Sequence, residues 1–247
     1  MFNVFIFILL ISNAYSSDNS EAIDIMGKKL TPFWSQELST NDLVKEQMRK
    51  LSITKKIPFG VIDTGFVKEH VKILNDINVD SKQRRGRNIK GHHGTSVANI
   101  INGDNNIGAS ENINYVLLRS APVTFYYSSI FSDILSMKER PRVISNSLGW
   151  GDNSVTEIVE KAHQLGILWF LASGNDYPSE VSKWESNSKA ILIGSYAPSG
   201  LQASSSQQDE NVVVLAPADD YQASVDGNGS CTRALHIDEA MDDKQLH

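Results

Sequence analysis

The sequence contains a single cysteine, Cys231, among its 247 residues. An intrachain disulfide is therefore excluded, and thiol chemistry would lack a partner residue. Metal-ligand spacing is also missing, because His92 and His93 are adjacent and the other histidines are scattered, with no cysteine nearby. We therefore expect no cofactor and no metal.

Basic charge is scarce as well. Lysine and arginine total 23 against 29 aspartate and glutamate residues, a formal net charge of −6. A nucleic-acid partner is not expected for such a chain. The one basic run, residues 82–90, is interpreted as a solvated loop.

Long apolar runs are limited to residues 2–11, which are too few to span a bilayer. Small residues in an A-x-A-like arrangement follow at 12–16 and indicate a secretory signal peptide, residues 1–16, cleaved after Ser16. An uncleaved anchor is the alternative, because no lysine or arginine precedes Lys28. We expect a secreted or periplasmic protein with no membrane contact beyond this leader.

The rest of the chain alternates apolar runs with segments of helical spacing. Strands are predicted at 57–63, 113–119, 142–149, 167–175, 190–195 and 212–217, and helices at 41–51, 97–101, 128–137 and 154–165. Gly166 is the expected stop of the last helix. Strands alternating with helices predict an α/β fold, a mostly parallel sheet with helices on both faces. We divide the chain into an N-terminal extension (17–57), one catalytic domain (58–233) and an atypical tail (234–247).

Polar residues stand where three of these strands end. They are Asp63, Ser147 with Gly149, and Asn175, while His93 opens a helix between the first two. Because parallel strands end at one edge of a sheet, we expect a carboxylate, an imidazole and an amide to gather there. A carboxylate that orients an imidazole, and an amide facing a developing oxyanion, suit acyl transfer.

The motifs Asp63-Thr64-Gly65, residues 93–98, 145–149 and 172–175, and Ala216-Pro217 occur in the order found in subtilisin-like serine proteases. Over residues 58–217 the chain resembles this subtilase family. The resemblance implies a three-layer fold, a polypeptide substrate, Asp63 and His93 as catalytic residues, and Asn175 in the oxyanion hole. It also implies that Ser147, Leu148 and Gly149 lie along the substrate backbone.

Rival interpretations of these motifs are weaker. His92 is the alternative imidazole, but Gly94-Thr95 after His93 matches the family motif. Asp-Thr-Gly also occurs in aspartic proteases, which need two such motifs or a dimer. Residues 105–108 resemble a family loop that sometimes binds calcium, yet Asp104 is its only evident carboxylate, so we assign no metal.

The nucleophile is the point of departure from the family. No Gly-Thr-Ser motif follows Pro217. In one interpretation Ser230, after Gly229, is a degenerate nucleophile. In the other, favoured because residues 238–245 are charged where the family helix is buried, the true segment is lost by truncation or an altered reading frame. The fold would then be incomplete at its C-terminal part, and the chain would be an inactive, at most peptide-binding, fragment or pseudoenzyme.

Overall fold

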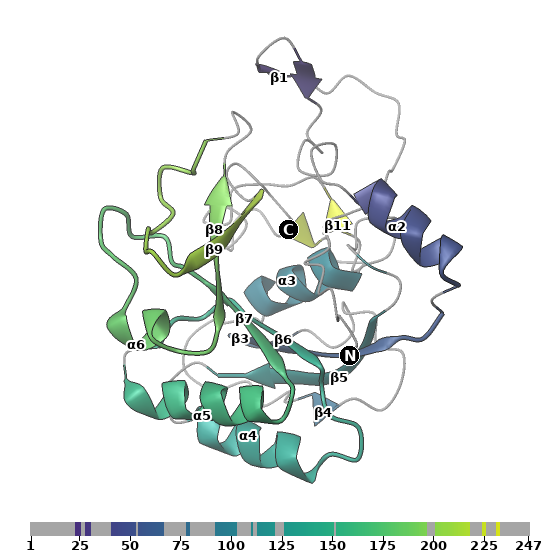
Figure 1. The fold of residues 1–247 in the computed structure, drawn as a ribbon, viewed down its shortest axis with the longest axis vertical. Coiled ribbons are helices and arrows are strands. Elements are labelled where there is room, and N and C mark those ends of the chain that lie inside the picture. Colours follow the sequence, from purple (N-terminus) through teal and green to yellow (C-terminus); the bar gives the residue numbers. More distant parts are fainter. Residues whose placement is uncertain are drawn as a thin grey trace.

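A seven-stranded sheet, parallel throughout, is the centre of the fold in the computed structural model (Figure 1). The strands lie in the order β4-β5-β3-β6-β7-β8-β9. Their bounds are β3 Ile57–Asp63, β4 Asn78–Val79, β5 Ile113–Ser120, β6 Val143–Asn146, β7 Leu168–Ala172, β8 Ile191–Tyr196 and β9 Val212–Pro217. The predicted parallel sheet is confirmed.

The structure describes residues 23–25, 28–30, 41–52, 54–66, 78–79, 92–102, 110, 113–121, 126–150, 152–196, 201–217, 224–225 and 231–232. The expected signal peptide, Ser230 and the expected tail at 234–247 lie outside these residues. No helix among the described residues is long and apolar enough to cross a membrane.

Helices cover both faces of the sheet. Figure 1 shows α3 (His92–Asn102) on one face and α4 (Tyr126–Ser136) and α5 (Asn153–Gln164) on the other. The remaining helices are α2 (Asn41–Lys50) and the short α6 (Lys183–Ser186). Two antiparallel pairs complete the described elements: β1 (Ile23–Ile25) with β2 (Lys28–Leu30), and β10 (Ser224–Val225) with β11 (Cys231–Thr232). The expected three-layer α/β architecture is therefore confirmed.

The core is divided by the sheet into two clusters. Successive residues of β3 point to opposite faces, so Val61 packs with Ala98 of α3, and Ile62 packs with the cluster under α4 and α5. Val61 and Ile62 are both fully buried. A strand buried on both faces explains why residues 57–63 form a continuous apolar run rather than an alternating one.

The sheet has its switch point at β3. β5 pairs with one side of β3, and β6, the strand after β5 in the chain, pairs with the other side of β3. Parallel sheets form their clefts where the strand order changes direction, at the carboxyl ends of the strands. Asp63, the last residue of β3, therefore lies at the place where this fold builds a site.

Two strands are shorter than the sequence predicts. β6 ends at Asn146 and β7 at Ala172, whereas 142–149 and 167–175 were expected to be extended. The last β6 residue paired with β3 is Asn146, which lies opposite Ile62, the residue before the end of β3. The residues after Asn146 and Ala172 lie outside the described strands, at the carboxyl edge of the sheet.

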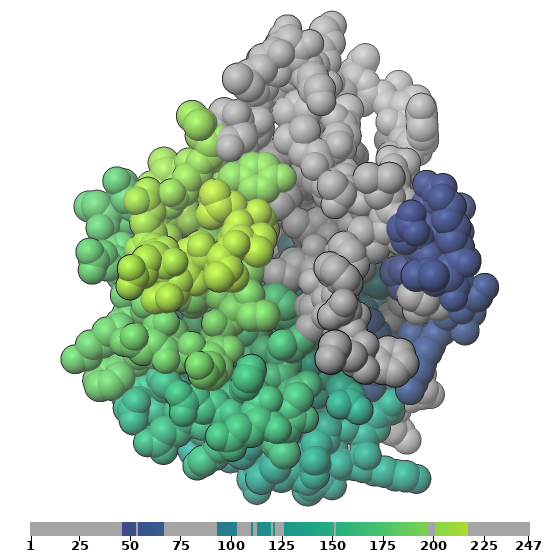
Figure 2. Space-filling model, in the orientation of Figure 1, coloured from purple at the N-terminus to yellow at the C-terminus, as the bar shows by residue number. Residues whose placement is uncertain are grey.

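At the other edge, β9 exposes three consecutive apolar residues. Val213, Val214 and Leu215 are 65%, 44% and 41% exposed. This segment lies on the visible surface in the yellow-green part of Figure 2. The strand preceding the expected nucleophile segment is thus uncovered by the described residues.

Candidate active site

Asp63 and His93 form a hydrogen-bonded pair. Asp63 ends β3, and His93 is the second residue of α3, the helix packed against that strand. His93 Nδ1 lies 2.6 Å from Asp63 Oδ1, and the two residues are 30 positions apart in sequence. The Asp63 side chain is fully buried and that of His93 is 21% exposed. One side of the imidazole therefore faces the carboxylate while the residue retains access to solvent.

The carboxylate is held by its neighbour as well. Thr64 donates from its backbone N at 2.6 Å and from its hydroxyl at 3.2 Å to Asp63 Oδ1. Asp63 Oδ2 has no hydrogen-bond partner among the described residues. The three hydrogen bonds of the Asp63 side chain in the described structure thus all involve Oδ1, the oxygen that contacts the imidazole.

The pKa of His93 is raised above its usual value. The hydrogen bond to Asp63 is the main cause, opposed by burial of the ring and assisted by the negative charge of Asp63. Because the carboxylate favours the protonated imidazole, it stabilises the imidazolium that a general base becomes when it accepts a proton. The pair therefore combines an imidazole that retains access to solvent with a carboxylate that stabilises its protonated form.

Residues 147–149, here called the edge segment, directly follow β6, the strand next to β3 in the sheet. Asn146, 2% exposed, anchors its start: Asn146 Oδ1 accepts a hydrogen bond from Leu148 N at 3.1 Å. Asn146 Nδ2 in turn donates to the Tyr127 hydroxyl at 3.0 Å. Within the described part of the chain, the backbone groups of Ser147 and Gly149 make no hydrogen bond. The edge segment therefore offers free backbone donors and acceptors to an extended peptide.

Asn175 lies beyond the next strand along the sheet. β6 and β7 are neighbours with Asn146 paired to Leu171, so the segments after them leave the sheet at the same edge. Gly174, just before Asn175, has φ +104, a conformation that glycine adopts without strain. The Asn175 side chain is exposed. Its proposed oxyanion role stays a prediction.

Of the remaining predicted residues, Ser230 lies outside the described residues, as does the possible calcium loop at 105–108. Among the residues that the structure describes, no group of three potential metal ligands occurs. Sequence reasoning missed α6 and its buried Glu185. The signal was present, because Ser182-Lys183-Trp184-Glu185 has the Ser-x-x-Glu spacing of a helix capping box.

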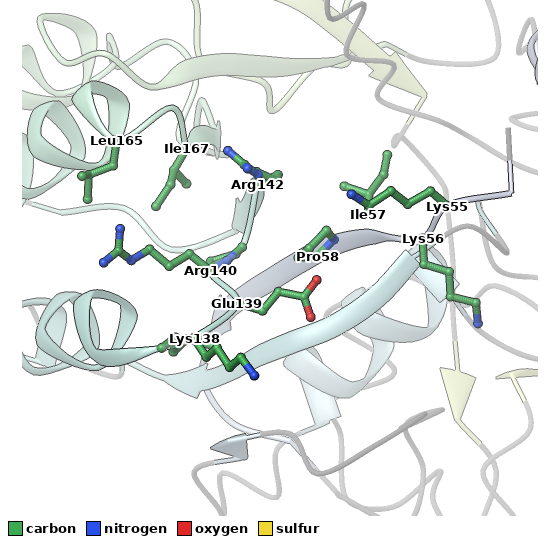
Figure 3. Close-up of a pocket in the computed structure, with 12 residues that line it drawn as sticks. Lys55, Lys56, Ile57, Pro58, Lys138, Glu139, Arg140, Arg142, Leu165 and Ile167 are labelled. Carbon is green, nitrogen blue, oxygen red and sulfur yellow. The ribbon is translucent and has the colours of Figure 1, made fainter.

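A pocket of about 620 Å³ lies at the opposite end of the sheet (Figure 3). It is formed where β3 and β6 begin, and its charged lining residues are Lys55, Lys56, Lys138, Glu139, Arg140 and Arg142. Asp63 and the edge segment lie where these strands end. The pocket is therefore separate from the candidate active site.

The chain is similar to known proteins at the level of family and fold. The family model described as Peptidase_S8, the subtilase family, matches residues 54–242. A search of curated proteins finds no match.

Solved structures with the same fold include three proteases. The psychrophilic subtilisin-like protease Apa1 from the Antarctic psychrotroph Pseudoalteromonas sp. AS-11 is 18% identical, with a TM-score of 0.50 over 70% of this chain and 44% of that chain. A cold adapted subtilisin-like serine proteinase is 24% identical, with a TM-score of 0.51 over 76% of this chain and 71% of that chain. The prenylagaramide maturation protease PagA is 17% identical, with a TM-score of 0.61 over 80% of this chain and 74% of that chain. The chain thus matches less than half the length of Apa1, and these likenesses concern the fold.

Proposed function

Because the chain belongs to the subtilase family, we propose that it is a serine-type endopeptidase in which Asp63 and His93 activate a serine hydroxyl. The 2.6 Å contact between Asp63 Oδ1 and His93 Nδ1 is the observation that carries this proposal. Asp63 holds the proton on Nδ1, so Nε2 is free to take the proton of the nucleophile and later to give it to the leaving amine.

The peptide substrate would lie along the edge segment, with Asn175 donating its side-chain N–H to the oxyanion. Backbone groups of Ser147 and Gly149 that make no hydrogen bond in the described structure support this arrangement, since an extended peptide binds an unpaired backbone segment through backbone hydrogen bonds. The amide of Asn175 is exposed at the same edge of the sheet. No cofactor is needed for this chemistry.

For an active enzyme we propose Ser230 as the nucleophile, in place of the interpretation favoured from the sequence, in which the family's serine segment is lost. The residue after it, Cys231, belongs to β11, which pairs with β10, and β10 packs against α3, the helix of His93. The family match reaches residue 242 and so includes this serine. Both observations support Ser230, although the family's Gly-Thr-Ser motif is missing.

A fluorophosphonate probe, followed by mass mapping of the adduct on the folded chain, tests the proposal. We expect one adduct on Ser230, absent in Ser230→Ala and strongly reduced in His93→Ala, because the imidazole activates the hydroxyl. A chain that unfolds cooperatively and yet takes no label on Ser230 would refute the assignment.

The missing motif favours a second candidate, a catalytically inactive member of the family that binds peptides along the edge segment. This candidate predicts binding of fluorescein-labelled casein peptides without cleavage. Measurable cleavage that disappears in His93→Ala would eliminate it.

We also propose that the chain is exported through the signal peptide at 1–16. N-terminal sequencing of the mature protein tests this, and a sequence starting at Ser17 is the expected result. A mature chain that still starts at Met1 would indicate the uncleaved anchor instead.

A further inference from the structure

Glu185 is a buried carboxylate that contacts the end of the edge segment. The residue lies in α6 and is 8% exposed. Its Oε1 accepts a hydrogen bond from Trp150 N at 2.6 Å across 35 positions of sequence. A Cβ added to Gly149 would lie 2.9 Å from the same oxygen. The carboxylate therefore binds Trp150 N, and a side chain at residue 149 would require it to shift.

Backbone N–H groups, rather than a cation, stabilise this carboxylate. Burial raises the pKa of Glu185, and backbone hydrogen bonds from Trp150 and Ser182 act in the opposite direction. No lysine, arginine or histidine among the described residues forms an ion pair with it. The 2.6 Å hydrogen bond joins α6 to Trp150, and it is strongest while the carboxyl group is ionised.

The side chain of Trp150 makes further contacts with α4 and α5. The residue is 4% exposed, and its indole Nε1 donates to the Thr156 hydroxyl of α5 at 3.3 Å. Thr156 donates in turn to the carbonyl of Trp184 in α6 at 2.8 Å. The Trp150 ring packs edge-on against Tyr127, with 6.2 Å between ring centroids. Trp150 is thus a rigid end point for the three residues that precede it.

The edge segment is consequently fixed at both ends. Asn146 holds its start through Leu148 N, and Glu185 holds its end through Trp150 N. Between them Gly149 is exposed, and the backbone groups of Ser147 and Gly149 have no partner in the described structure. A backbone held in this way loses little conformational entropy when an extended peptide pairs with it.

We propose that Glu185 is a positioning residue for peptide binding: its carboxylate, through Trp150 N, holds Gly149 in the conformation that pairs with the substrate backbone. The proposal rests on the peptide-directed function proposed above. Glu185 contacts neither Asp63 nor His93 in the described structure, so its action is on binding and not on proton transfer.

The first measurement is hydrogen–deuterium exchange of the full chain, which needs no substrate. In Glu185→Gln the acceptor is neutral and one oxygen is lost, so we expect faster exchange at the amide of Trp150. Glu180→Gln is the matched control, because Glu180 is an exposed carboxylate five residues earlier whose side chain makes no contact with the edge segment in the described structure. Unchanged exchange at Trp150 would overturn the proposal.

The second measurement is the affinity for fluorescein-labelled casein peptides, by anisotropy in a His93→Ala background that prevents cleavage. Glu185→Gln should raise Kd by about tenfold, as expected for weakening one hydrogen bond to a charged group. With active enzyme the same change should appear in KM, with kcat unchanged. Faster exchange at Trp150 without any change in affinity would show that Glu185 is only structural.

A double-mutant cycle of Gly149→Ala and Glu185→Ala tests the proposed contact independently of Glu185→Gln. Gly149→Ala should weaken binding in the parent, where its Cβ meets the carboxylate, and should cost less in Glu185→Ala, where that oxygen is gone. Additive effects would contradict the proposed contact. If the parent binds no peptide at all, the peptide-directed function fails, while the exchange experiment still decides whether Glu185 holds the segment.

Discussion

A Cβ built on Gly94 would lie 2.2 Å from the carbonyl oxygen of Gly65 and 2.9 Å from Cβ of Asp63. The first turn of α3 therefore touches the backbone that follows β3 with no space for a side chain. This close approach is what allows His93, the preceding residue, to reach Asp63. The glycine after the histidine is explained by packing and not by backbone flexibility.

Gly94→Ala should destabilise the protein and separate the Asp63–His93 pair. The nearest obstacle is a backbone oxygen, which moves only if the loop or the helix shifts. We expect a loss of about 1–3 kcal/mol, typical of an overpacked site, measured by urea unfolding. Ser96→Ala, on the same helix at a half-buried position, is the control and should change the stability far less. A Gly94→Ala protein of parent stability would contradict the close packing.

Asp63→Asn should lower the pKa of His93, because the hydrogen bond to Asp63 is the main reason for its increase. NMR titration of the imidazole measures this directly. In the parent, the base form of His93 accumulates only as pH rises through a value above 6.5, so hydrolysis should increase across that range. The variant should show this rise at lower pH, with kcat about 10⁴-fold smaller, as for the equivalent change in a serine protease triad.

The same raised pKa has the opposite effect on stability. The folded protein binds the His93 proton more tightly than the unfolded chain, so this contribution is complete below pH 6.5 and is lost as pH rises through the folded value. In urea unfolding at several pH values, Asp63→Asn should reduce this dependence. An identical pH dependence in both proteins would show that the pair does not determine the titration.

Asn146→Ala should cost about 1–3 kcal/mol of stability, since Leu148 N and the Tyr127 hydroxyl would lose a buried partner. Its effect should include faster hydrogen exchange at Leu148. Asn153→Ala is the matched control, because that side chain is exposed and its hydrogen bond in the described structure is to Glu157. We expect the control to stay within about 0.5 kcal/mol of the parent.

Gly166→Ala should destabilise the protein by about 1–2 kcal/mol through backbone strain alone. Gly166 follows α5 with φ +74, and a Cβ there would meet nothing within 4 Å. An L side chain in this region is unfavourable even with space available. Gly166→Asn should cost less than Gly166→Ala, because asparagine tolerates this conformation better, and thermal unfolding of the two variants checks the order.

Local signals in the sequence were sufficient for most elements. The strands at 57–63 and 212–217 have the predicted bounds, and the helix predicted at 154–165 is α5, with Asp152 as its cap and Gly166 beyond its end. Apolar periodicity, capping residues and glycine act over a few neighbouring positions, so they are readable without the fold. The apolar runs extend past the strand ends at 146 and 172, because where a strand ends depends on hydrogen bonds to its neighbours in the sheet and not on the run itself.

The sequence by itself determined the parallel α/β class and the residue types at the site, because burial pattern and motif order are properties of the linear chain. Only the tertiary structure decided that β3 lies between β5 and β6, that His93 Nδ1 reaches Asp63 Oδ1, and that Glu185 binds Trp150 N. These contacts join residues 30 and 35 positions apart. Their formation depends on how helices and strands pack across the sheet, which no local pattern encodes.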